Sequence, residues 1–310
     1  MITIAEVDDV RSLCDAARAD GRSVGLVPTM GAFHAGHCSL MRAARRDCDL
    51  VVVSLFVNPT QFGPSEDLQA YPRDAEGDAA RAIAEGVDVL FTPSSVAMYP
   101  EPMRTTVQVA GLTDRLCGAS RPTHFAGVTT VVTKLLSIVG PCRAYFGRKD
   151  AQQLAVIRRM VRDLNLPAEI VGCPLVRDAS GLAMSSRNAY LTAEERADAL
   201  VLAWSLFGAC EAIGEGERDA VLIRSRLADA IASRPTVRLD YAEVVDGENL
   251  DVVDRIEGEV LLAVAAFVGR TRLIDNATVR VDGDHVEAEL GVVSVAGRPP
   301  TPRGAFAGCP

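Results

Sequence analysis

The sequence lacks an excess of positive charge, and it lacks closely spaced pairs of cysteines. Lysine and arginine total 32 against 41 acidic residues, so the 310 residues carry a formal net charge of −9. Proteins that bind nucleic acid usually show a basic face, so we do not expect this partner. The eight cysteines form no C-x-x-C pair or cluster, which argues against metal-finger and dithiol redox motifs and favours free thiols in a reducing cytosol.

We also expect no targeting or membrane segment in these residues. The first residues, Met1 to Glu6, have neither the basic region nor the apolar core of a signal peptide, so we expect none. The apolar stretch from Val128 to Val139 contains Lys134 and is too short to cross a bilayer. The sequence offers no convincing Ser-His-Asp or Cys-His set. We therefore expect a cytosolic protein without a membrane-spanning segment.

Residues 1 to about 175 alternate apolar runs with amphipathic stretches. Strands are predicted at residues 24–27, 50–57, 87–91, 143–146 and 168–173. Helices are predicted at residues 39–46, 74–85, 128–139 and 151–164. Nearly continuous apolar strands separated by helices favour an α/β fold with a parallel sheet covered on both faces. Ligands on such sheets bind at the carboxyl ends of the strands.

A different pattern begins near Val176. Thr192 is the predicted N-cap of a helix that runs to Ile213, and Glu195 completes a capping box. A further helix is predicted at residues 219–233, and strands at 239–245, 259–268 and 271–281. These elements predict a smaller α+β domain over residues 176–281. The periodicity fades beyond it, so residues 282–310 are expected to form a disordered tail.

Two of the four histidines, His34 and His37, lie three residues apart between a predicted strand and a predicted helix. The segment Pro28 to His37 is rich in glycine, which lets the backbone approach a ligand, and free amides at a helix N-terminus attract anions. Imidazoles there can donate to phosphate oxygens. A single histidine is more often structural, but this pair predicts a phosphate site. Metal ligation is the competing interpretation, weakened because no third soft ligand lies nearby in the sequence.

Two further loops carry side chains that suit a nucleotide. Ser185, Ser186 and Arg187 follow a glycine-led turn, and arginine presents a planar fork to phosphate oxygens. In the loop that begins at Gly147, Lys149 can neutralise phosphate and Asp150 can accept from ribose hydroxyls. Each loop alone could equally be a capping loop or a strand-to-helix turn with solvated charges.

Weaker candidates follow other predicted elements. The segment 58–62 places amide side chains at a strand end, and Arg121 with His124 could line the same cleft. Asp78 could hold a hydrated Mg²⁺ beside phosphates, although a solvated carboxylate on a helix is the simpler interpretation.

Taken together and in this order, the motifs resemble those of the pantothenate synthetase (pantoate–β-alanine ligase) family. The resemblance runs from about residue 2 to about residue 281. Its segments are residues 28–31, 34–37, 56–62, 71–73, 121–128, 149–150, 152–154, 184–188 and 271–276. The His-x-Gly-His turn alone marks a wide nucleotidyl-transferase superfamily, whereas the whole set is specific to this family.

The resemblance implies an α/β fold with a Rossmann-like parallel sheet over residues 1–175 that binds ATP and pantoate. A smaller α+β C-terminal domain over residues 176–281 would act as a lid and support dimerisation. The implied reaction belongs to coenzyme A precursor synthesis. ATP and pantoate form a pantoyl adenylate and pyrophosphate, and the amine of β-alanine then gives pantothenate and AMP. The family is cytoplasmic and homodimeric.

The resemblance also assigns site residues by position. The catalytic group would be His34, His37, Lys149, Ser185, Ser186 and Arg187. Pantoate would be bound by Gln61 and Gln153. ATP would be bound by Met30, His34, His37, Gly147, Lys149, Asp150, Val176, Met184, Ser185, Ser186 and Arg187. Asp78 would help to bind Mg²⁺.

Two other functions stay open at this point. A related nucleotidyl transferase would move AMP or CMP onto a phosphorylated acceptor and release pyrophosphate without AMP. A non-catalytic nucleotide-binding protein would bind ATP without forming product. Arg148 and Ala151, where the family usually has Glu and Tyr, would fit such a loss of activity. A tRNA-charging enzyme is disfavoured by the acidic balance and by the lack of an anticodon-type domain.

Overall fold

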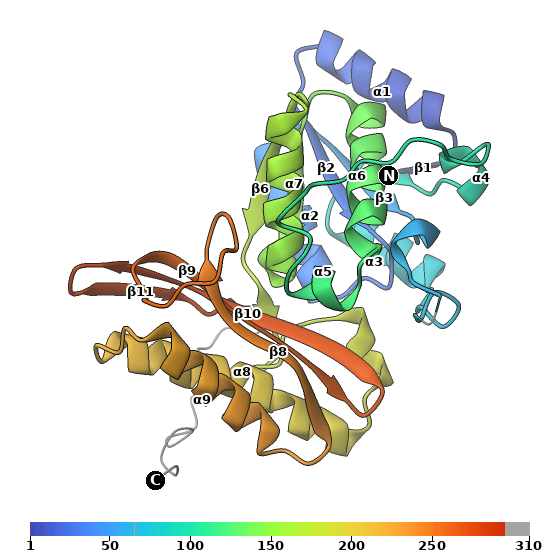
Figure 1. Ribbon diagram of the computed structural model, residues 1–310. Coiled ribbons are helices and arrows are strands. Elements are labelled where there is room, and N and C mark those ends of the chain that lie inside the picture. Colours follow the sequence, from blue (N-terminus) through green and yellow to red (C-terminus); the bar gives the residue numbers. More distant parts are fainter. Residues whose placement is uncertain (65, 295–310) are drawn as a thin grey trace. The chain divides into compact units, whose positions relative to one another are not determined.

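The computed structural model describes residues 1–64 and 66–294 and divides into two compact units (Figure 1). The first unit contains residues 1–114, 121–148 and 152–173. The second contains residues 115–120, 149–151 and the described chain from 174 onward. The sequence analysis expected two continuous domains that meet at 175 and 176, so the short segments 115–120 and 149–151 are additions to the second unit that it did not foresee.

The first unit is built on a six-stranded sheet with the order β1-β4-β3-β2-β5-β6, in which every pair is parallel. The strands are β1 (Ile2–Ile4), β2 (Val24–Thr29), β3 (Leu50–Leu55), β4 (Val89–Phe91), β5 (Cys142–Gly147) and β6 (Ala168–Cys173). The predicted parallel α/β sheet is therefore confirmed. The strand order reverses between β2 and β5, and open α/β sheets bind ligands beyond the carboxyl ends of the strands at such a point.

Helices cover both faces of this sheet. Figure 1 shows α6 and α7 on one side and α2 on the other. The helices of the first unit are α1 (Val7–Ala19), α2 (Ala35–Asp47), α3 (Ala75–Ala84), α4 (Ser95–Met98), α6 (His124–Val139) and α7 (Ala151–Asp163). Leu40, Met41 and Ala44 on α2 are buried against Val51 and Val53 of β3 because they recur at helical spacing. Burial of each large side chain stabilises the fold by about 1.5–3 kcal/mol.

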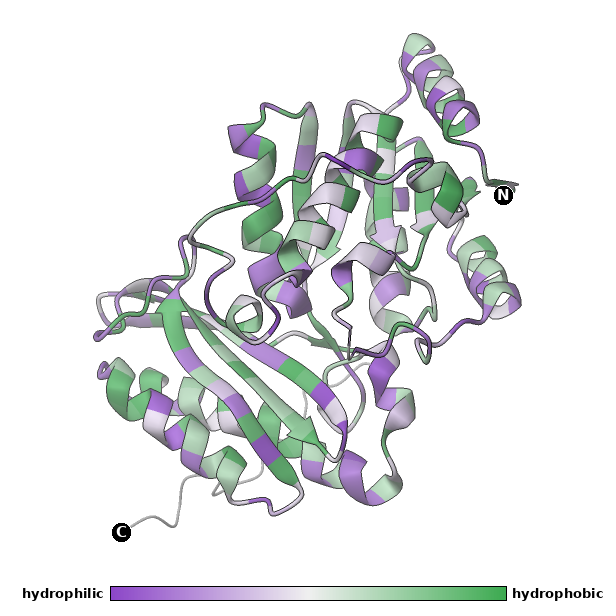
Figure 2. Ribbon diagram, turned by 45° about the vertical axis from the view of Figure 1, so that its right-hand side comes forward, coloured by the Kyte–Doolittle hydropathy of each residue, from purple (hydrophilic) through white to green (hydrophobic). Residues whose placement is uncertain are grey.

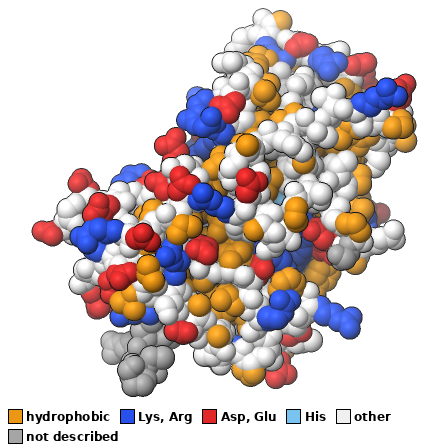
Figure 3. Space-filling model, in the orientation of Figure 1, with side chains coloured by type: hydrophobic (Ala, Val, Ile, Leu, Met, Phe, Trp, Pro, Cys, Tyr) orange, Lys and Arg blue, Asp and Glu red, His pale blue; other side chains and the backbone are white. Residues whose placement is uncertain are grey.

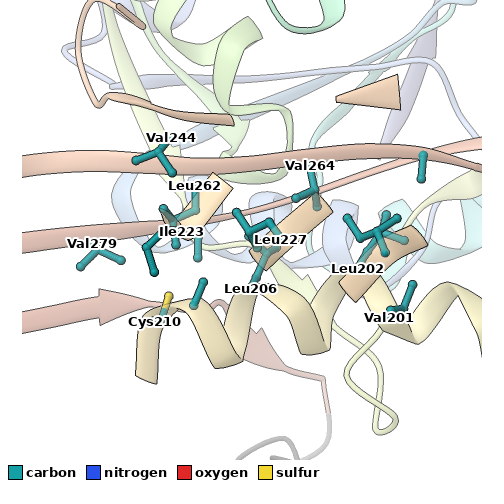
Figure 4. Close-up of a cluster of buried hydrophobic side chains, with 14 of the residues drawn as sticks. Val201, Leu202, Leu206, Cys210, Ile223, Leu227, Val244, Leu262, Val264 and Val279 are labelled. Atoms are coloured by element: carbon teal, nitrogen blue, oxygen red, sulfur yellow. The ribbon is translucent and has the colours of Figure 1, made fainter. Parts of the chain in front are cut away.

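The second unit contains an antiparallel sheet with the order β11-β10-β9-β8, packed against two helices. Its elements are α8 (Ala193–Gly214), α9 (Ala220–Ala232), β8 (Val237–Asp246), β9 (Gly258–Val268), β10 (Thr271–Asp282) and β11 (His285–Glu289). Figure 4 shows Leu206 of α8 and Leu227 of α9 in one buried cluster with Leu262 and Val264 of β9. In Figure 2 the strands of the first sheet are mostly hydrophobic, whereas those of the second sheet are more mixed.

Helix α8 begins as the sequence predicts. The Thr192 hydroxyl accepts from the Glu195 amide at 3.1 Å, and the Glu195 carboxylate accepts from the Thr192 amide at 2.9 Å. This confirms the predicted capping box. Among the described helices, α8 alone is long and apolar enough to cross a membrane by length and composition, but 61% of its most apolar window is buried inside the protein. It is therefore a core helix of the second unit.

Part of the expected tail is ordered, which corrects the sequence analysis. β11 pairs with β10 from Thr278 to Asp282, and β12 (Val292–Val293) pairs in parallel with β7 (Val176–Arg177). β11 is a mostly exposed edge strand, so backbone pairing forms it and a strong hydrophobic pattern is not required. Residues 295–310 of the expected tail lie outside the described residues.

Candidate active site

Three loops of the predicted site leave neighbouring strands of the first unit at the same edge of the sheet. The turn with the histidine pair follows β2, the segment η1 (Pro59–Gln61) follows β3, and Gly147 ends β5. β2 lies between β3 and β5 and is parallel to both. Their carboxyl ends therefore meet where the strand order reverses, which is the expected position for a ligand site.

The two histidines sit at the N-terminus of α2 with a defined hydrogen-bonding pattern. His34 caps the helix, and its Nδ1 accepts from the Gly36 amide at 3.1 Å. His37 Nδ1 faces the His34 amide at 3.4 Å, and the two ring centroids are 4.1 Å apart. A nitrogen that accepts carries no hydrogen, so each neutral ring bears its hydrogen on Nε2. Both rings therefore present an Nε2–H donor.

Two backbone amides of the turn, just before the helix start, are already engaged. The Ala32 and Phe33 amides donate to the two carboxylate oxygens of Asp78 at 2.7 and 2.6 Å. Asp78 lies on α3 and is only 1% exposed. Burial raises the pKa of this carboxyl, although the two amide bonds act in the opposite direction.

These contacts also bear on the expected Mg²⁺ ligand. Magnesium prefers octahedral oxygen ligands and usually keeps several waters. Both oxygens of Asp78 face backbone amides, and the described residues contain no group of three or more His, Cys, Asp or Glu that could hold a metal ion. The geometry thus fits a carboxylate that shapes the turn.

Gln61, the expected pantoate residue, is held by a network that the sequence analysis did not resolve. Asn58, which is 1% exposed, donates from Nδ2 to Gln61 Oε1 and to the Gly127 carbonyl, both at 3.2 Å. The Gln61 amide nitrogen contacts Met30 Sδ at 3.0 Å. Sequence analysis treated Asn58 only as part of a weak motif. Its position at a strand end was the available signal.

The carbonyl of Gln61 is fixed by residues at and just before the start of α6. His124 Nδ1 lies 2.9 Å from the Gln61 carbonyl, and Arg121 approaches the same oxygen at 3.4 Å. Arg121 also forms a bidentate ion pair with Glu66, in which Glu66 Oε1 accepts from Arg121 Nε at 2.7 Å. Burial is the largest influence on the pKa of Glu66 and raises it, but the bonds from Arg121 and Gly63 together outweigh burial and hold that pKa below its usual value.

The second unit contains the remaining predicted ATP-binding residues. The Met184 amide donates to the Val176 carbonyl at 2.9 Å, which fixes the start of the serine-arginine loop. Ser185 then caps the short helix η3 (Ser186–Tyr190), since its hydroxyl accepts from the Arg187 amide at 3.3 Å. Lys149 and Asp150 belong to this unit as well.

A fully buried ion pair supports this loop. Arg177 is 0% and Asp275 is 3% exposed, and their side chains form two bonds of 2.7 and 2.9 Å. Arg177 also donates to the Gly181 carbonyl at 3.0 Å, so β7, the following turn and β10 are joined. Sequence analysis missed this pair because its members are 98 residues apart.

The predicted site residues thus fall into two groups, each described within its own unit. The first unit holds Met30, His34, His37, Gln61, Asp78, Gly147 and Gln153. The second unit holds Lys149, Asp150, Val176, Met184, Ser185, Ser186 and Arg187. That both groups bind one ATP molecule stays a prediction. Figure 3 shows acidic and basic side chains interspersed on the visible face. Because the net charge is −9, an anionic substrate must be held by local donors.

Comparisons with known proteins agree with these motifs. The model of the family described as pantoate-beta-alanine ligase matches residues 2–278. A pantothenate synthetase from Acetivibrio thermocellus is 53% identical over 281 residues, covering 91% of this chain and 100% of that protein. One from Moorella thermoacetica is 55% identical over 273 residues, covering 88% and 96%.

Solved structures are similar too. The crystal structure of pantothenate synthetase from Thermus thermophilus matches with a TM-score of 0.84 and 46% identity, covering 89% of this chain and 98% of that one. A pantoate-beta-alanine ligase from Francisella tularensis, solved with beta-gamma ATP and beta-alanine, matches with a TM-score of 0.69 and 33% identity, covering 89% and 97%. The chain therefore belongs to the pantoate–β-alanine ligase family.

Proposed function

We propose how the residues of this chain divide the work of pantoate–β-alanine ligation. The reaction is the ATP-dependent condensation of pantoate with β-alanine, which gives pantothenate, AMP and pyrophosphate through a pantoyl adenylate. The observation that carries the assignment is the pair of imidazoles at the N-terminus of α2, whose acceptor bonds leave an Nε2–H on each ring. The relative that was solved with an ATP compound and β-alanine supports the same substrates.

In the first step, the pantoate carboxylate attacks the α-phosphorus of ATP, and pyrophosphate leaves. Negative charge is spread over phosphoryl oxygens, so preorganised donors lower the barrier. We assign this role to His34 and His37 in the first unit. Lys149 and the loop of Ser185, Ser186 and Arg187 supply further donors from the second unit. Arg187 suits the task because its guanidinium can donate two parallel bonds to a phosphate.

Pantoate binding falls to Gln61 and Gln153. The side-chain amide of Gln61 is oriented by Asn58, which donates to Oε1. Its Nε2 faces the weakly accepting sulfur of Met30, so a substrate oxygen would replace this contact with a stronger bond. Gln153 lies half-buried on α7. Amides suit pantoate because they pair with both hydroxyl and carboxylate groups.

In the second step, the amine of β-alanine attacks the acyl carbon of the adenylate and AMP leaves. Asp150 would accept from the ribose hydroxyls, while Met30, Gly147, Val176 and Met184 would border the nucleotide. An acyl adenylate hydrolyses readily, so we propose that the C-terminal domain acts as a lid that excludes water.

Three further features belong to this proposal. Mg²⁺ accompanies ATP as the counter-ion of its phosphates and is not assigned to Asp78. The enzyme works as a cytoplasmic homodimer, which light scattering of the purified protein would test. Its partners are the small molecules ATP, pantoate and β-alanine, with no nucleic acid or membrane.

One product analysis tests the function. The purified enzyme should form AMP, pyrophosphate and pantothenate in equal amounts when ATP, Mg²⁺, pantoate and β-alanine are all present. Omission of pantoate should abolish turnover, and turnover that survives the omission would exclude the proposal. Pyrophosphate without AMP during turnover would indicate a nucleotidyl transferase. ATP binding without any product would indicate a non-catalytic nucleotide-binding protein.

A further inference from the structure

The turn that carries the histidine pair has a demanding backbone conformation. Gly31 and Ala32 both have positive φ, +87° and +51° respectively. Glycine adopts this region freely, but alanine is disfavoured there because its Cβ approaches the following carbonyl oxygen. Something outside the turn must therefore hold Ala32 in place.

Asp78 supplies that hold from α3. The consecutive amides of Ala32 and Phe33 donate to its two oxygens at 2.7 and 2.6 Å. Successive backbone N–H groups in such a turn form a small anion-binding hollow. In this chain the hollow is filled by a carboxylate that is 1% exposed, so these two amides are not available to an ATP phosphate.

The two amides lie directly before His34, whose main chain and side chain begin α2. The orientation of both rings depends on that start, because His34 Nδ1 accepts from Gly36 and the His34 amide faces His37 Nδ1. A shift of the turn would therefore move both Nε2–H donors together.

We propose that Asp78 is a positioning residue that holds the histidine turn in its ATP-binding conformation, and that it is not a magnesium ligand. The inference rests on the proposed function for the identity of the phosphate compound. The two possible roles of Asp78 can be told apart by measurement. A residue that positions the turn affects ATP binding with or without metal, whereas a metal ligand affects it only when Mg²⁺ is present.

The test is calorimetric binding of ATP in excess EDTA, followed by rate measurements over a range of free Mg²⁺. Asp78→Asn keeps the size of the side chain but replaces one acceptor oxygen by a donor. It should weaken metal-free ATP binding by about tenfold or more, which corresponds to about 1.4 kcal/mol. The Mg²⁺ concentration for half-maximal rate should change by less than about twofold. The matched control is Glu76→Gln, an exposed residue on the same helix, which should behave as the wild type.

Unchanged metal-free binding in Asp78→Asn would overturn the proposal, whether or not the Mg²⁺ requirement rises. A rescue variant adds a second test. Ala32→Gly in the Asp78→Asn background should restore part of the lost affinity, because glycine accepts the positive φ without help. No rescue combined with a raised Mg²⁺ requirement would instead indicate a metal ligand.

A further variant applies if Asp78→Asn does not fold, as judged by circular dichroism. A Cβ on Gly31 would lie 3.0 Å from Asp78 Oδ2, so Gly31→Ala should displace the carboxylate and weaken metal-free ATP binding in the same way. Normal binding by that variant would contradict the proposal.

A wild-type protein that binds ATP but makes no pantothenate would overturn the proposed function and leave the inference about Asp78 intact. One that binds no ATP would overturn both.

Discussion

The side-chain amide of Asn276 donates to the main-chain oxygen of Lys149 at 2.8 Å, across 127 residues of sequence. Lys149 is one of two lysines in the chain, and Asn276 on β10 is 7% exposed. Its neighbour Asp275 pairs with Arg177, so the lysine backbone and the start of the serine-arginine loop are tied to the same strand. The second unit thus places its proposed phosphate-binding groups on one rigid support.

Loss of the Asn276 amide should therefore weaken ATP use more than it weakens the fold. For Asn276→Ala we expect kcat/KM for ATP to fall by about fivefold, because one hydrogen bond contributes about 1 kcal/mol and Lys149 is freed to move. Steady-state kinetics with ATP varied would measure this. Asn249→Ala, at an exposed turn of the same unit, is the control. Equal kinetics for Asn276→Ala and the wild type would refute the support role.

Breaking the buried ion pair should destabilise the protein strongly. Asp275→Ala leaves the Arg177 charge buried and unpaired, which typically costs about 3–5 kcal/mol. Glu169→Ala removes an exposed ion pair with Arg143, in which the two side chains are 62% and 48% exposed, and solvent screens such a pair, so the loss should be far smaller. Urea unfolding of both variants would compare them directly. A loss below about 1 kcal/mol in Asp275→Ala would contradict a stabilising role for the buried Arg177–Asp275 pair.

The histidine pair should control adenylate formation. His34→Ala or His37→Ala should lower kcat for pyrophosphate release by about 10²–10³, the usual effect of removing one preorganised donor. A coupled pyrophosphate assay would measure the change, and His285→Ala on exposed β11 provides the control. Circular dichroism should show an intact fold in each variant. Normal turnover in both histidine variants would remove their assigned role.

Pantoate use should depend on Gln61 and on the residue that orients it. Gln61→Ala should raise the KM for pantoate or lower kcat, with little change in the KM for ATP. Asn58→Ala should produce the same selective defect in weaker form, because it leaves Gln61 present but unoriented. Kinetics with each substrate varied in turn would separate these effects. An unchanged KM for pantoate and kcat in Gln61→Ala would exclude it from the pantoate site.

The Glu66–Arg121 pair predicts a pH-dependent contribution to stability. The pKa of Glu66 is lowered from its usual 4.5, so its ionised form adds stability above about pH 4.5, and this contribution is lost as the pH falls through the folded-state pKa. Glu66→Gln should therefore lower Tm at pH 7 by more than it does in acid. Calorimetric scans at several pH values would measure the difference. In an Arg121→Ala background the substitution should have a smaller effect, and an equal effect there would rule out the pairing.

Much of the fold followed from local sequence patterns. The run 50–57 predicted β3, the stretch 219–233 predicted α9, and Thr192 with Glu195 predicted the start of α8. The first helix was missed because its buried positions, Val10, Cys14 and Ala17, include only one strongly hydrophobic side chain. β11 was missed because an exposed edge strand needs little hydrophobic pattern.

The sequence by itself determined the two imidazoles at one helix start, because residues three apart near a helix N-terminus are neighbours in any fold that forms the helix. It also determined the parallel sheet, since buried strands must be nearly continuous in apolar residues. Tertiary structure alone decided that Asp78 occupies the turn amides, that Asn58 orients Gln61, and that Asn276 holds Lys149. The bonds made by Asp78 and Asn276 join segments far apart in sequence, and the Asn58–Gln61 bond depends on how a loop packs. No local pattern records which buried polar groups will satisfy one another.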